Sequence, residues 1–184
     1  MNRAFALLLL SGLLLASMAL TTAYARDADD PDALKWAEAE IQLPAFPQEV
    51  NLREFYVSEL TTHKFYIDTS SLSVGADGVV RYVLVVRTSG GATNFSYEGI
   101  RCASRELKIY ASGRQDRKDS QGGQWSKARR GEWRPIENKP VNRHHAALAR
   151  GLFCPNGIPI RTPAEGQEAL RLGRHPEVSR HELY

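Results

Sequence analysis

Charged residues in the middle of a valine-rich stretch are the first candidates for chemistry. Glu98, Arg81 and Arg101 fall between Gly78 and Cys102, in sequence typical of two long strands. Charged residues in the middle of a sheet can line a site, and an envelope hydrolase or ligand-modifying enzyme would use Glu98 with a neighbouring group. The pairing of the strands favours a structural role instead, because it sets Arg81 diagonally opposite Glu98, and such cross-strand pairs are common in antiparallel sheets. We therefore predict an Arg81–Glu98 charge pair and assign no catalytic residue.

The other signals for catalysis or metal binding are weak. The sequence has no G-x-S-x-G, H-E-x-x-H, glycine-rich phosphate loop or C-x-x-C. His144 and His145 are adjacent, and neighbouring side chains on a helix point about 100° apart, which is poor geometry for one metal ion. We predict a partly buried His145, an exposed His144, no metal site and no cofactor.

A basic, tryptophan-containing segment is the one region with binding character. Residues 114–134 hold seven basic and three acidic residues, a balance of +4, with two tryptophans among them. Arginine and tryptophan are enriched at interface hot spots. The candidate binding residues are Trp125, Arg129, Arg130 and Trp133. The competing interpretation is that both tryptophans fill the core while the charges are solvated.

The N-terminus predicts export. Arg3, the apolar run from Ala4 to Leu20 and the sequence Ala23-Tyr24-Ala25 match a secretory signal peptide, with cleavage expected after Ala25. Residues 26–173 are then predicted to form one periplasmic domain, followed by a disordered tail, residues 174–184. Loss of Arg3 lowers the formal net charge from +3 to +2. This small excess gives no indication of nucleic-acid binding, and no later segment is apolar and long enough to span a membrane.

The two cysteines are predicted to form a disulfide. Cys102 and Cys154 are the only cysteines in the sequence, and an isolated pair in an oxidising compartment is most simply bonded. The bond would close a loop of about 50 residues, worth roughly 4 kcal/mol in the chain-entropy model.

Gly90-Gly91 predicts a tight two-residue hairpin turn between the two long strands. That turn sets Val79 opposite Cys102 and places Val79 and Val83 on the face that receives a late helix. Tyr82, Leu84, Phe95 and Tyr97 are then expected on the reverse face, under an N-terminal helix or the tryptophans. A shift of one residue would exchange faces along one strand.

The remaining patterns predict an α+β fold, with an antiparallel sheet of five or six strands and a C-terminal helix packed on one face. Helices are expected over residues 31–43, 142–153 and 163–172, the last begun by Thr162-Pro163-Ala164-Glu165 and ended by Gly173. Further strands are expected over residues 51–57, 64–68, 72–74 and 106–111, and residues 113–124 are expected to form a mobile loop.

Several segments together resemble the cryptic neisserial protein family of Gram-negative envelope proteins. The most specific are Asp77-Gly78-Val79-Val80-Arg81-Tyr82 and Tyr97-Glu98-Gly99-Ile100-Arg101-Cys102, and the resemblance runs from about Trp36 to Cys154. It implies an exported domain of no established activity. Some family members look lipid-anchored, whereas this chain lacks the cysteine for such an anchor.

These observations favour a soluble periplasmic interaction or accessory domain without catalysis. Its expected partner is an envelope protein or another anionic envelope component. An envelope enzyme that uses Glu98 is the alternative, and a deep cleft with Glu98 at its base would favour it.

Overall fold

The computed structural model describes residues 36–116, 118–119 and 122–179. These residues form an antiparallel sheet in which six strands pair in chain order, with a two-residue strand, β7 (Arg134–Pro135), beside β5. The six strands are β1 (Leu52–Phe55), β2 (Lys64–Val74), β3 (Val79–Arg87), β4 (Thr93–Arg101), β5 (Glu106–Gln115) and β6 (Gly123–Lys127). The predicted α+β fold is confirmed. The signal peptide and the first residues of the predicted helix at 31–43 lie outside the described residues.

The hairpin of β3 and β4 has a register that differs by one residue from the prediction. The structure pairs Val79 with Arg101 and Val80 with Ile100. Thr88 N–H donates to the carbonyl of Ala92 at 2.8 Å, so the loop has three residues, and only Gly91 adopts a positive φ, 85°. Glycine pairs suit this three-residue turn as well as the two-residue one that we predicted.

The corrected register exchanges the predicted faces. Val80, Tyr82 and Leu84 share a buried cluster with Cys102, whereas Val83 packs on the reverse side with Phe95 and Tyr97. The prediction that the late helix covers Val79 and Val83 is therefore wrong, because the longer turn slides β4 along β3 by one residue.

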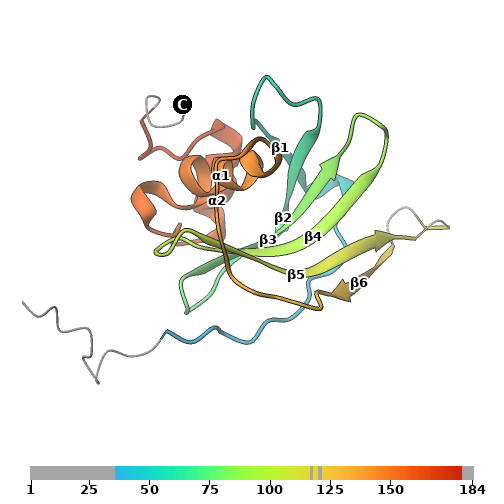
Figure 1. The fold of residues 1–184 in the computed structure, drawn as a ribbon, viewed down its shortest axis with the longest axis horizontal. Helices are drawn as coiled ribbons and strands as arrows, with labels where there is room; N and C mark the ends of the chain where they lie inside the picture. The colour runs from blue at the N-terminus through green and yellow to red at the C-terminus, as the bar shows by residue number, and fades with distance from the viewer. Residues whose placement is uncertain (1–35, 117, 120–121, 180–184) are drawn as a thin grey trace, which may run out of the picture. The chain divides into compact units, whose positions relative to one another are not determined.

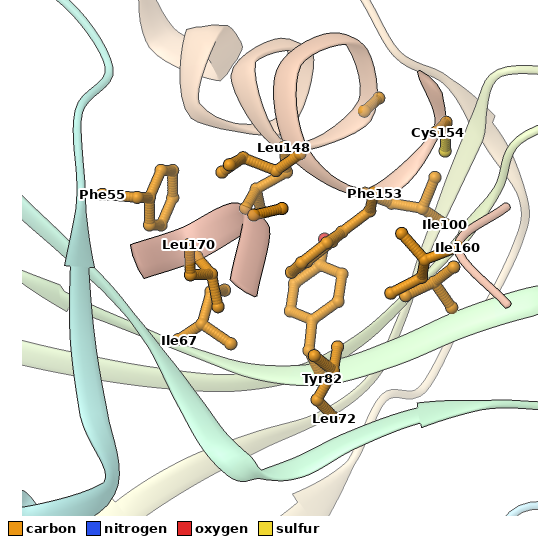
Figure 2. Close-up of a cluster of buried hydrophobic side chains, with 14 of the residues drawn as sticks. Phe55, Ile67, Leu72, Tyr82, Ile100, Leu148, Phe153, Cys154, Ile160 and Leu170 are labelled. Carbon is orange, nitrogen blue, oxygen red and sulfur yellow. The ribbon is translucent and has the colours of Figure 1, made fainter. Parts of the chain in front are cut away.

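Helices cover one side of the sheet, here called the helical face. Helix α1 (Arg143–Ala147) continues as a π-helical segment, Leu148–Phe153, and α2 (Pro163–Leu172) follows (Figure 1). Figure 2 shows Leu148, Phe153 and Leu170 pointing into the space above Tyr82 and Ile67. The Cys102–Cys154 disulfide, with Cα atoms 5.4 Å apart, joins the end of the π-helical segment to the end of β4, as predicted.

An extended segment covers the other side, here called the strap face. We call residues 37–48 the strap; they have no regular secondary structure, so the predicted helix is wrong for the part that the structure describes. Ile41, Leu43 and Phe46 pack on the cluster formed by Val83, Val85, Phe95, Tyr97, Tyr110 and Ala111. The apolar residues whose spacing suggested a helix therefore belong to an extended segment that packs on the sheet.

Two segments predicted to lack structure are ordered in part. Strand β5 runs on to Gln115 and β6 begins at Gly123, so both ends of the predicted loop are strand. The start of the predicted tail is packed: His175 is 2% and Val178 3% exposed, and His175 N–H donates to Gly151 O at 2.7 Å. Residues 180–184 lie outside the described part of the chain.

Candidate functional site

Glu98 is the centre of a buried polar cluster on the helical face. The residue pairs with Tyr82 across β3 and β4 and is 2% exposed. Its Oε1 accepts from the Ser96 hydroxyl at 2.6 Å. Its Oε2 lies 3.2 Å from the Tyr82 hydroxyl and 2.9 Å from His145 Nε2. Both carboxylate oxygens are thus held by side chains of the protein itself.

The cluster holds Glu98 ionised in spite of its burial. Burial alone would raise the pKa of Glu98, but the charge and hydrogen bond of His145, together with the hydrogen bond from Ser96, lower the net pKa below the usual range. Burial and the charge of Glu98 raise the pKa of Tyr82 well above its ordinary value, so Tyr82 stays a hydrogen-bond donor. The carboxylate is therefore compensated by several donors.

Helix α1 brings both histidines to this cluster. His145 is 7% exposed, as its place on the apolar face predicts. His144 is half-buried rather than exposed, because its ring stacks on Phe65 with centroids 5.0 Å apart and lies 4.0 Å from the His145 ring. Burial and the adjacent His145 lower the pKa of His144 to about 4, so its ring is neutral at neutral pH.

The Glu98–His145 pair has the geometry by which a carboxylate orients a catalytic histidine. A catalytic role also requires an opening through which a substrate reaches these groups. A cavity of about 510 Å³ lies nearby, with His63, Phe65 and His144 among its walls, but Glu98 and His145 do not line it. Of the residues in this cluster, His144 lines the cavity, whereas the Glu98 carboxylate does not.

The predicted Arg81–Glu98 pair is wrong. The two side chains leave the sheet on opposite faces, because the register sets Arg81 against Gly99 and Glu98 against Tyr82. Arg81 instead binds Asp77, with Nη2 and Oδ2 2.5 Å apart, and its guanidinium lies 5.7 Å from the Tyr110 ring centre. Burial would raise the pKa of Asp77, but hydrogen bonds from Arg81 and from the N–H groups of Ala39 and Val79 lower it to about 2.

Both tryptophans of the predicted binding segment face the strap. Trp125 Nε1–H donates to the carbonyl of Pro44 at 2.9 Å, and its ring lies 5.4 Å from that of Phe46. Trp133 Nε1–H lies 3.3 Å from Glu38 Oε2, which also binds Lys108 Nζ at 2.6 Å. These contacts favour the core-filling interpretation for the indoles.

Arg129 and Arg130 lie in the turn between β6 and β7, and both are exposed. Neither forms a hydrogen bond or ion pair with any other residue that the structure describes. Their charges are therefore open to solvent, on a segment that Trp125 and Trp133 fix at both ends.

Sequence reasoning missed the residues that tie the strap to the sheet. Asp77 is one of them, because its Oδ2 accepts from Ala39 N–H at 2.9 Å. Tyr110 reaches this face because the register shifts by one between Tyr97 and Glu98 on β4, which places a bulge in β5. The sequence pattern that predicted a strand over residues 106–111 gave no sign of the bulge.

Two further properties of the described residues bear on function. Within the segments that the structure describes, no group of three or more histidine, cysteine, aspartate or glutamate residues is placed to hold a metal ion. Among the helices of the same segments, none has the length and hydrophobicity that a membrane crossing needs.

Comparison with known proteins confirms the resemblance noted from the sequence. A profile of the CNP1-like family matches residues 31–171. The chain belongs to the CNP1-like family. It is similar to Cryptic neisserial protein 1 of Neisseria gonorrhoeae (strain ATCC 700825 / FA 1090), with 27% identity over 181 residues, which covers 89% of this chain and 86% of the relative. No solved structure matches.

Proposed function

We propose that this CNP1-like chain is an exported, non-catalytic interaction domain of the bacterial envelope that binds an anionic component through Arg129 and Arg130. One observation carries the proposal: two adjacent arginines are exposed and unpaired among the described residues, on a turn whose flanks are fixed by partly buried indole contacts. A fixed turn loses less conformational entropy on binding than a flexible one. We call Arg129, Arg130 and their exposed neighbours Lys127 and Arg134 the basic ridge.

The buried carboxylate supports the non-catalytic part of the proposal. Glu98 has its oxygens taken by Ser96, Tyr82 and His145, and it lines none of the cavities described above or below. Removing such a group from its partners would cost several kcal/mol. Its natural role is to fix helix α1 on the sheet.

Binding to isolated envelopes tests the ridge. The double variant Arg129→Glu/Arg130→Glu should lower retention of the purified protein at least tenfold, and wild-type retention should fall as salt rises, because exposed charges are screened. The matched control is Arg53→Glu/Lys64→Glu, which makes the same charge change at exposed sites on β1 and β2, at the opposite edge of the sheet. If both double variants lose retention equally, retention depends on net charge alone. That result would contradict specific binding through the basic ridge.

A second candidate function has one observation in its favour. The 2.9 Å contact between Glu98 and His145 is the arrangement expected of an envelope hydrolase in which a carboxylate orients a histidine. The variant Glu98→Gln distinguishes the hydrolase from the interaction domain. An enzyme would lose turnover while keeping its substrate affinity, whereas the interaction domain would keep its envelope binding and lose only stability.

A further inference from the structure

A second surface, away from the basic ridge, has the features of a small-molecule site. A cavity of about 430 Å³ opens between the segment after β1 and the helical residues of the C-terminal half. Its walls include Val57, Ala147 and Leu152, with Tyr56 at the rim. Binding sites for small ligands commonly measure about 300 to 1,000 Å³. We call this cavity the alanine pocket, after the alanines on its helical wall.

The apolar wall exists because the helix carries small residues there. Ala146 and Ala147 line the pocket where a larger side chain would fill it. Leu152 and Val57 continue the apolar surface, and both also pack on the main core. The cavity is not part of the main hydrophobic core, because Leu148 and Phe153 are already fully buried beneath the helix.

The polar part of the pocket is basic. Arg143 and Arg150 lie about two helical turns apart, and both line the cavity. None of the described residues in its walls is acidic, and neither arginine forms an ion pair within the described part of the chain. Arg143 Nη1 donates to the Ser58 hydroxyl at 2.9 Å, a neutral partner that positions the guanidinium without compensating its charge.

We propose that the alanine pocket binds one acyl chain of an anionic amphiphile, with the chain against Val57, Ala147 and Leu152 and the carboxylate or phosphate head between Arg143 and Arg150. The charge complementarity selects the head, because guanidinium groups form paired hydrogen bonds with such anions. The apolar wall selects the chain, since each buried methylene contributes favourably to binding. The ligand is either a free fatty acid or a membrane lipid that offers the same chemistry.

Titration of the full chain with 13C-carboxyl decanoate, followed by NMR, tests the site. Decanoate should bind saturably, and decanol, which has no charge, at least tenfold more weakly. Arg150→Gln should weaken decanoate binding about tenfold, whereas Arg53→Gln, at an exposed site on β1 outside the pocket, should leave it unchanged. Ala147→Phe should abolish it. Because a phenylalanine there could disturb folding, the exposed Arg150→Gln and a circular dichroism melt keep the test decisive.

A second arm distinguishes the source of the ligand. Vesicles of phosphatidylglycerol should compete with decanoate if a membrane lipid is the natural ligand, and should leave decanoate binding unchanged if a free fatty acid is. Equal affinity for decanoate and decanol, or unchanged binding by the Arg150 variant, would overturn the proposal. So would binding to the vesicles without any binding of decanoate.

Discussion

The two faces of the sheet are covered in different ways. On the helical face, α1, the π-helical segment and α2 form a regular layer that a disulfide joins to β4. On the strap face, an extended segment is held by separate side-chain contacts, such as that of Trp125 with Pro44 and that of Asp77 with Ala39. The helical face therefore resists unfolding as a unit, whereas the strap depends on a few independent anchors.

The largest expected effect comes from cutting the covalent link of the helical face. Cys102→Ser/Cys154→Ser should lower the free energy of unfolding by about 4 kcal/mol, because the bond closes a loop spanning 52 residues of sequence separation. Urea unfolding of the oxidised protein and of the variant measures it. A loss under about 1 kcal/mol would show that packing alone holds the helices on the sheet.

The next largest effect is the pH dependence of stability, which should fall in a different pH range for each face of the sheet. The pKa of His144 is depressed to about 4 in the folded protein, so the unfolded chain takes up this proton first as the pH falls. Stability is then complete above about pH 6.5 and is lost between about 6.5 and 4, by up to about 3 kcal/mol.

The strap face should respond only at lower pH. Asp77 has a folded pKa of about 2, so its contribution is present above its ordinary pKa and is lost as the pH falls from about 4 towards 2. Urea unfolding at pH 7, 5 and 3 with His144→Gln checks the assignment, with the exposed His63→Gln as control. If the His144 variant keeps the full loss between pH 6.5 and 4, another group is responsible.

Removing the buried charge at Glu98 should cost about 2 kcal/mol. Glu98→Gln keeps the size of the side chain but replaces one acceptor oxygen with a donor, which leaves donors such as Tyr82 or His145 facing an NH₂ group. Glu54→Gln, at a salt bridge whose partners are both more than half exposed, should cost under about 1 kcal/mol. Equal losses in thermal melts would mean that the cluster does not stabilise the helical face.

The smallest effect is expected on the strap. Trp125→Phe removes the hydrogen bond to Pro44 and should cost about 1 kcal/mol. Amide exchange should accelerate in residues 41–48 and stay unchanged in β3. Phe153→Leu, on the helical face, should instead lower protection throughout the sheet. Faster exchange of β3 in the Trp125 variant would show that the strap is part of the main cooperative unit.

The helical face could be predicted from the sequence better than the strap face. Regular periodicity identified the helix that carries His145, and Thr162 and Gly173 bounded the last helix. The disulfide was predicted from the presence of only two cysteines and from the predicted export of the chain. The strap has no period, and its anchors lie 38 residues apart for Ala39 and Asp77 and 81 for Pro44 and Trp125. Local sequence patterns do not predict contacts between residues so far apart in the chain.

The candidate site was predicted less well because the partners of Glu98 depend on the length of one turn. Gly90-Gly91 is compatible with loops of two or three residues, and the choice determines which side of the sheet Glu98 shares with other groups. The shorter loop directed Glu98 towards Arg81, whereas the observed one directs it towards Tyr82 and His145. Arg81 and Glu98 both lie within the sheet, but the sequence did not determine which groups they would contact.

In-cell photo-crosslinking tests most directly whether function resides at the basic ridge or at the buried cluster. A photoreactive amino acid replaces the exposed Glu132, beside the ridge, in the wild-type, Glu98→Gln and Arg129→Glu/Arg130→Glu chains. We predict that the wild type and the Glu98 variant capture the same anionic envelope component and that the double arginine variant loses it. Capture that persists without the two arginines, or that disappears with Glu98→Gln in a folded protein, would contradict the proposed function.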